Sequence, residues 1–354
     1  PLPRPKVMED REKVEKYQLK LLKALGKDIP IAKTKKSKPS KDSKPSVDKK
    51  TFSKIKKLLT ARDINLIDQG LELVRSLDND SLYQKLLKGI HYKVFKSKTY
   101  RGEEQENGRL VPNPTFTGTG PAQPYLNYAM RGLINNAPND FVQKIRNEVK
   151  VLNLDFFGDI SNFINLEQLY MSYNDGGKQT ISYLKEFSVF EKLTSLGMYG
   201  DFIHTDQDLK GLSNLKELTS LSLSIGWGNA ISLKTLVGME NCRELQELKI
   251  GGCAKLIDVE GINGCQKLKS IQLSEAKRLE NLNGLKGLKS LKTITIDDAE
   301  SLDNLDGLKG CDSLEEIKID GSNYSGNKKI KQPIKNVDGL IGLKKLKDLN
   351  LSSF

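Results

Sequence analysis

From residue 149 onward, the apolar residues follow a short pattern, L-x-x-L-x-L, that recurs nine times. Alternation of apolar and polar positions predicts a strand with one buried face and one polar face. The steps from one leading position to the next are 17, 27, 25, 27, 23, 23, 23 and 32 along the chain. The nine sets are Val149, Leu152, Leu154; Leu166, Leu169, Met171; Leu193, Leu196, Met198; Leu218, Leu221, Leu223; Leu245, Leu248, Ile250; Leu268, Ile271, Leu273; Leu291, Ile294, Ile296; Leu314, Ile317, Ile319; and Leu346, Leu349, Leu351.

A column of glycines fixes the phase of these repeats. Each glycine lies seven residues before the next leading leucine, so the variation in length falls between the strand and the glycine. In its strand pattern and its repeat length, the segment 149–354 resembles the leucine-rich-repeat family. The glycines are Gly211, Gly238, Gly261, Gly284, Gly307 and Gly339.

The resemblance implies an α/β solenoid with a parallel β-sheet on its concave side. One such strand cannot bury its own leucines, but stacked repeats share a continuous core. At ~4.8 Å per strand, nine repeats would span roughly 40 Å, enough to bind a small protein.

The chain before the repeats divides by composition into three parts, which with the repeats gives four expected domains. An amphipathic helix is followed by a linker rich in Lys, Ser and Pro, which lacks the apolar residues for a core. Next comes a small α-helical unit containing an irregular Gly/Pro-rich segment, for which we consider one hairpin. The expected boundaries are 1–25, 26–50, 51–147 (irregular over 91–124) and 148–354.

The net charge of +12 lies entirely in the N-terminal arm. Residues 1–57 contain 19 Lys or Arg against 7 Asp or Glu, whereas the rest of the chain is neutral. This argues against one large cationic face on the folded body and favours a basic tether. The tether lysines are Lys33, Lys35, Lys36, Lys38, Lys41 and Lys44, and a second basic patch in a long insertion contains Lys328, Lys329 and Lys331.

The four cysteines fall into apolar columns of the repeat. Cys242, Cys265 and Cys311 each lie three residues before a leading leucine, where other repeats have Phe or Leu, and Cys253 shares a column with alanines. We therefore expect buried free thiols, no zinc site, and a reducing, cytoplasmic location. The sequence also lacks catalytic motifs, phosphate loops and an apolar run long enough to span a membrane, so we expect no enzyme and no cofactor.

The concave face should be small and polar, with aromatic residues in the early repeats. Aromatics beside small polar residues are typical of protein-binding surfaces, although they could equally cover core edges or pack against the helical unit. The acidic residues Asp297, Asp298 and Asp320 are interpreted as a solvated face and not as a calcium site. The candidate partner-binding residues are Tyr170, Tyr173, Tyr199, Ser222, Trp227, Lys249 and Lys318.

Three functions remain open from the sequence. The first is a non-enzymatic scaffold subunit that binds another protein, or copies of itself, through the repeats and is tethered by the arm. The second is a nucleic-acid- or ribosome-associated factor that uses the Lys-rich arm. The third is a regulatory module of a larger enzyme. Because the last strand lacks a polar cap, we also expect its edge to be covered by more chain or by another subunit.

Overall fold

The computed structural model describes residues 47–98, 104–111, 123–154, 160, 162–172, 187, 189–200, 206–224, 232–321 and 334–352. They belong to a compact unit that begins at Ser46. The predicted N-terminal helix and nearly all of the linker lie outside the described residues. Within the described part, no helix combines the length and the apolar character that crossing a membrane requires.

Five helices precede the repeats, where helical periodicity predicts them. Side chains of Asp48, Asp63 and Asn79 cap the first three by accepting backbone N–H groups, which helix starts leave unpaired. Pro138, which precedes the last of these helices, makes no side-chain capping bond. The helices are α2 (Lys49–Leu59), α3 (Ile64–Leu77), α4 (Asp80–Leu87), α5 (Gln123–Asn136) and α6 (Asn139–Glu148).

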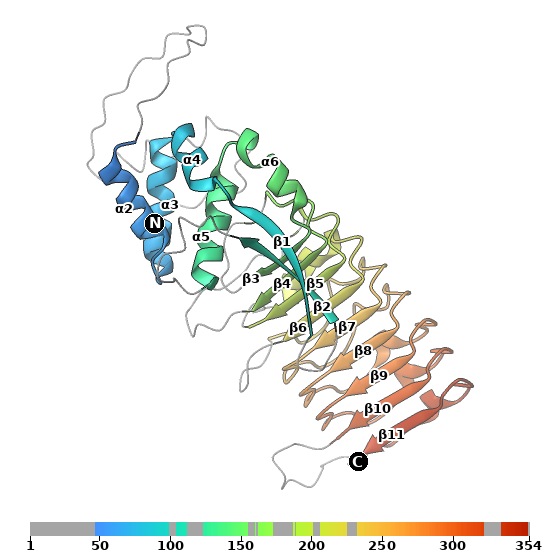
Figure 1. Ribbon diagram of the computed structural model, residues 1–354. Coiled ribbons are helices and arrows are strands. Elements are labelled where there is room, and N and C mark those ends of the chain that lie inside the picture. The colour runs from blue at the N-terminus through green and yellow to red at the C-terminus, as the bar shows by residue number, and fades with distance from the viewer. Residues whose placement is uncertain are drawn as a thin grey trace, which may run out of the picture. The chain divides into compact units, whose positions relative to one another are not determined.

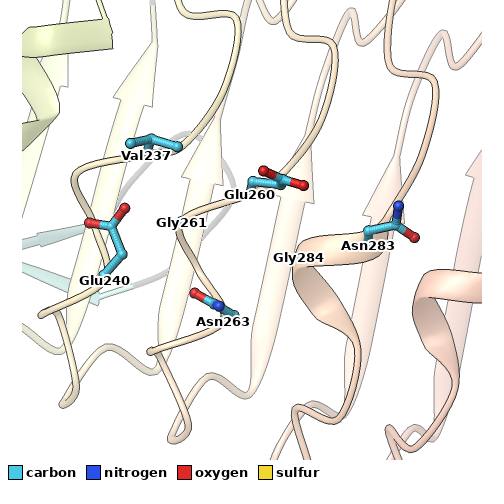
Figure 2. A pocket seen from close by; sticks show the side chains of 7 residues that line it. All are labelled: Val237, Glu240, Glu260, Gly261, Asn263, Asn283 and Gly284. Atoms are coloured by element: carbon cyan, nitrogen blue, oxygen red, sulfur yellow. The ribbon is translucent and has the colours of Figure 1, made fainter.

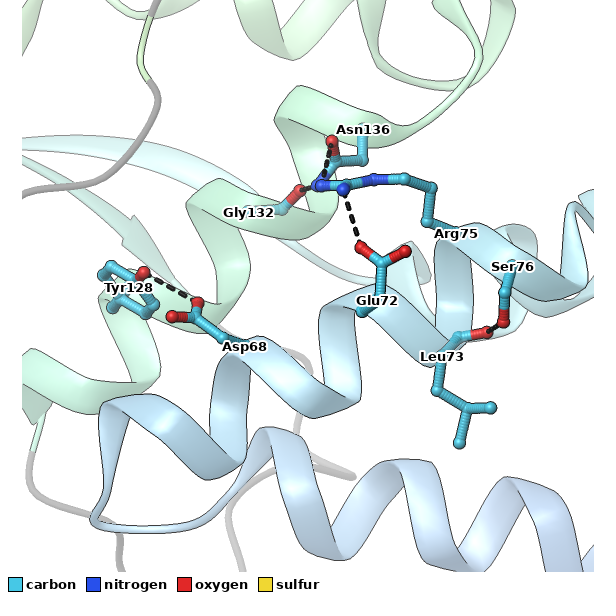
Figure 3. A network of polar contacts seen from close by, with 8 residues as sticks. All are labelled: Asp68, Glu72, Leu73, Arg75, Ser76, Tyr128, Gly132 and Asn136. Atoms are coloured by element: carbon cyan, nitrogen blue, oxygen red, sulfur yellow. Dashed lines mark hydrogen bonds and ion pairs between the residues drawn. The ribbon is translucent and has the colours of Figure 1, made fainter. Parts of the chain in front are cut away.

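Helices α3 and α5 pack closely and are joined at their surface by polar contacts (Figure 3). A Cβ atom at Gly132 would lie 2.4 Å from Leu71 Cδ1, so the missing side chain lets the helices approach. Tyr128 Oη donates to Asp68 Oδ1 at 2.8 Å, and Arg75 Nη2 donates to Asn136 Oδ1 at 3.1 Å.

A two-stranded antiparallel hairpin, β1 (His91–Lys98) with β2 (Glu104–Val111), lies within the segment expected to be irregular. The hydroxyl of Tyr92 joins it to the first repeat strand, since it donates to Val151 O at 2.6 Å and accepts from Val151 N. The buried Arg146 of α6 donates to three carbonyls at the end of α5, those of residues 134, 135 and 137. Hairpin and helices therefore cover the first strand of the solenoid, as a capping unit must.

The repeats form one parallel sheet of nine strands, whose spatial order follows the sequence (Figure 1). The alignment confirms the predicted register, because the middle apolar residues, such as Leu152, Leu169 and Leu196, pair from strand to strand. The strands are β3 (Val151–Leu154), β4 (Gln168–Ser172), β5 (Ser195–Tyr199), β6 (Ser220–Ser224), β7 (Glu247–Ile250), β8 (Ser270–Leu273), β9 (Thr293–Ile296), β10 (Glu316–Asp320) and β11 (Asp348–Ser352).

The strand leucines form a continuous core between successive coils, where one coil is one repeat. From β4 to β10 the middle apolar residues are no more than 1% exposed. In the last described coil the core columns open to solvent, and Val337 and Leu349 are 47% and 46% exposed because no further coil in the described region packs on them. Each leucine is therefore buried chiefly by the neighbouring coil.

The glycine column marks a contact between the backbones of successive coils. A Cβ atom at Gly284 would lie 2.0 Å from Val259 O, and one at Gly307 would lie 2.0 Å from Leu282 O. Gly284 does not have a positive φ, so the reason for glycine here is space rather than backbone conformation. This explains why the sequence keeps these glycines in phase while other spacings vary.

The cysteines occupy the apolar columns that the sequence predicts. All four are buried and unpaired, and none is more than 2% exposed. Burial raises the pKa of the Cys242 thiol to about 11 and those of Cys253 and Cys265 to about 12. At neutral pH these side chains are therefore neutral apolar groups of the core, not reactive thiolates.

Two neighbouring glycines give a matched test of the backbone contact. We expect Gly284→Ala to destabilise the protein by about 3 kcal/mol or more, because its Cβ meets a fixed carbonyl. Gly287 has φ +75° and nothing within 4 Å of an added Cβ, so Gly287→Ala should cost only ~1 kcal/mol through backbone strain. Urea unfolding measures both variants, and equal losses would contradict the assigned contact.

Thiol labelling tests the burial of the cysteines. Since folding raises the thiol pKa values, almost no thiolate exists at pH 8 and none of the four should react with an aromatic disulfide reagent within minutes. In guanidinium chloride, all four should react at once. Rapid labelling of any thiol in the native protein would show that its coil opens readily.

Candidate functional site

The concave face consists of the strand residues that alternate with the buried leucines. Strand pairing places Tyr170 beside Gly197, Ser222 between Gly197 and Lys249, and Lys318 at the same level in β10. Five of the seven predicted partner-binding residues are thus described and lie on one face. Tyr173 and Trp227 lie outside the described residues, as do the six tether lysines and the insertion lysines Lys328, Lys329 and Lys331.

Tyr170 lies across the neighbouring strand instead of projecting from the sheet. A Cβ atom at Gly197 would be 2.6 Å from Tyr170 Cδ1, so the ring occupies the space that a side chain at residue 197 would fill. The Tyr170 hydroxyl is 3.1 Å from Ser195 Oγ and 3.4 Å from Gln168 Oε1. The half-buried ring is therefore held in place before any partner arrives.

Beside this ring the face is built from short polar side chains. Tyr199, at the end of β5, remains 39% exposed, and Ser222 of β6 is half-buried. Further along, Thr293 Oγ1 donates to Ser270 Oγ at 2.9 Å across two strands. Such a surface offers hydroxyl groups for hydrogen bonding, and the short side chains next to Tyr170 let a partner approach the sheet.

The two predicted lysines of the concave face differ in their surroundings. Lys318 is paired with Glu316 on its own strand, and Asp348 of β11 is 4.0 Å away. The hydrogen bond and the charge of Glu316 raise the pKa of Lys318. Among the described residues, Lys249 has no such ion pair. Of the two, Lys249 is therefore the ammonium group that is free to contact a partner.

The acidic residues after β9 and β10 only partly match the sequence-based interpretation. Asp297 and Asp320 are partly exposed, whereas Asp298 is 7% exposed, so a solvated position is wrong for this residue. Burial raises the pKa of Asp298, and the charge of Lys277 partly opposes this effect. The φ of Asp298 is +58°, a left-handed conformation that forms the turn after β9. At the equivalent position two coils earlier, Gly252 has the same conformation.

A pocket that the sequence does not predict lies over the glycine column, away from the concave face (Figure 2). Its volume is about 350 Å³, and Gly261 and Gly284 leave its floor without side chains. Glu240 folds back so that its carboxylate accepts from Gly238 N at 2.9 Å. The only sequence signal for this hollow is the glycine phase itself. The lining residues are Val237, Glu240, Glu260, Gly261, Asn263, Asn283 and Gly284.

The described residues bring together no metal-binding set of three or more His, Cys, Asp or Glu side chains. Tyr128 and the core thiols owe their raised pKa values first to burial. These groups lie between helices or inside the coils and not on the concave face. Among the described residues, that face offers hydrogen bonding, aromatic contact and the ammonium group of Lys249.

Comparison with known proteins identifies similar folds. No protein-family model and no curated relative matches the chain. Among solved structures, it is similar to an internalin from Listeria monocytogenes (19% identity, 63% of this chain and 73% of that chain, TM-score 0.38). It is also similar to a leucine-rich-repeat protein of Leptospira interrogans (17%, 60% and 57%, TM-score 0.37), of which it therefore spans less than two thirds. A third similar structure is the leucine-rich-repeat domain of the type III effector XopL (14%, 59% and 70%, TM-score 0.30).

The chain's own repeat carries the assignment of the fold. Nine L-x-x-L-x-L strands pair in register, and their leucines form one core between coils. Glycines in a constant phase bring successive backbones into contact. These features identify the fold of the repeats as a leucine-rich-repeat solenoid.

Proposed function

We propose that this protein is a non-enzymatic interaction subunit that binds a protein partner on the concave face, around Tyr170. The observation that carries the proposal is the Tyr170 ring resting on Gly197 beside a surface of small polar side chains. Rigid, partly exposed aromatic rings dominate the energetics of many protein interfaces. A surface that binds in this way needs no catalytic group.

The composition of the surrounding face supports the same function. Tyr199 adds a second ring that is 39% exposed, and Ser222 offers a hydroxyl group. Lys249 offers an ammonium group that forms no ion pair with any described residue. Tyrosine with serine and glycine is a frequent combination in binding surfaces, because the ring supplies contact area while small neighbours allow close approach. The wider leucine-rich-repeat fold presents such a face over nine strands.

We further propose that the protein is a scaffold subunit of a larger assembly in the cytoplasm. In this proposal the basic tether, with Lys33, Lys35, Lys36, Lys38, Lys41 and Lys44, holds a neighbouring component while the repeats hold the protein partner. The lysine content of the arm supports the tether, and the four unpaired thiols support a reducing compartment. Tyr173 and Trp227 are included among the proposed partner-binding residues on composition alone.

Loss of the two rings should weaken binding without unfolding the protein. We expect Tyr170→Ala combined with Tyr199→Ala to cost about 2 kcal/mol of binding free energy, roughly 30-fold in affinity. Partners recovered from native lysate on the tagged full chain would be identified by mass spectrometry, and their affinity for each variant measured. Ile164, which is 55% exposed outside the concave face, provides the control Ile164→Ala.

A single methyl group offers a sharper form of this test. Gly197→Ala introduces a Cβ that forces the Tyr170 ring aside, while alanine is compatible with the strand backbone. The melting temperature should stay within a few degrees of the parent, yet the affinity for the same partners should fall. Unchanged affinity in both variants would remove the concave face from the proposed function.

A further inference from the structure

Lysines gather on the outer turns of two consecutive coils, apart from the concave face. The segments 261–270 and 284–293, which lead into β8 and β9, contain five lysines and no acidic residue. The next turn adds Lys309. The neutral total charge of the repeats therefore conceals a local excess of positive charge.

Only part of this charge is neutralised by neighbours. Lys267 pairs with Glu244 at 2.6 Å, and Lys292 lies 3.7 Å from Glu315. Lys269 donates to the neutral side chain of Gln246 at 2.8 Å. The remaining three, Lys286, Lys289 and Lys309, are exposed, and their ammonium groups make no ion pair with any described residue. We call these three residues the lysine cluster.

The fold holds the lysine cluster together. Lys286 directly follows the short 3-10 turn Asn283–Leu285, and Lys309 follows the equivalent turn Asp306–Leu308 of the next coil. The two turns stack, because Gly287 N donates to Lys309 O at 3.1 Å. Lys289 directly follows the buried Leu288, three residues after Lys286, and is exposed.

Acidic residues lie beside the lysine cluster and within it, since the exposed Asp306 begins the turn that Lys309 follows. Towards the preceding coils lies the pocket with Glu240 and Glu260. Towards the last coil, Asp312 takes the repeat position that Lys289 has one coil earlier. The positive surface is therefore a short strip that crosses adjacent coils, whose strands lie about 4.8 Å apart.

We propose that the lysine cluster binds the phosphate backbone of a nucleic-acid duplex, without reading its sequence. Lysines neutralise phosphates and release their counterions, whereas protein interfaces are depleted in lysine and enriched in aromatic residues and arginine. The cluster contains neither aromatic residues nor arginine, so it lacks groups for stacking on unpaired bases. This surface is separate from the proposed protein-binding face, and either can fail without the other.

The salt dependence of binding isolates the contribution of the cluster. The full chain would be titrated against a labelled DNA duplex of mixed sequence, about two helical turns long, at several salt concentrations. The test variant combines Lys286→Gln, Lys289→Gln and Lys309→Gln, and the control combines Lys54→Gln, Lys57→Gln and Lys85→Gln on α2 and α4. Both variants keep the six tether lysines and lose the same charge.

Each phosphate contact contributes about 0.9 to the slope of log affinity against log salt concentration. We expect the cluster variant to lower the slope by roughly 2 to 3 and the affinity at low salt by tenfold or more, with the control close to the parent. Equal slopes in the two variants would overturn the proposal and leave duplex binding to other lysines. Tight binding of an octaglutamate peptide, lost in the same variant, would overturn it as well and assign the cluster to an acidic protein instead.

Discussion

The repeats depend on one constraint: two backbones must touch at the glycine column while leucines fill the space between coils. Leucine burial supplies the favourable free energy, since each coil covers the apolar face of the next. The glycines determine how near the coils can come, because a Cβ at Gly284 would overlap the carbonyl of Val259. Insertions are therefore confined to the path between strand and glycine, where they disturb neither contact.

A solenoid of this kind also needs a covered first strand, and the helical unit provides it through polar contacts as well as packing. The Tyr92 hydroxyl satisfies both the N–H and the carbonyl of Val151, as a neighbouring strand would. Arg146 of α6 donates to three carbonyls at the end of α5, which fixes these two helices to each other. Such contacts join distant residues, so local sequence patterns give no sign of them.

The sequence predicts the solenoid well because its signals are local and repeated. Alternation within each strand sets the buried face, and repetition of the pattern sets the register, so even the burial of Cys265 and Cys311 could be predicted. The candidate site was predictable only as a set of positions on one face. That Tyr170 lies on Gly197, that Lys318 is paired and Lys249 is not, and that Asp298 is buried all depend on neighbours one repeat away.

Backbone hydrogen bonds join successive coils on more than the strand side, for instance from Leu236 N to Glu260 O and from Glu280 N to Ile257 O. A coil anchored to its neighbour on several sides has little freedom to tilt or slide. The residues on its surface therefore keep their spacing whether or not a partner is bound. Ordering this surface upon association costs little conformational entropy, so any entropic penalty of binding falls mainly on the partner.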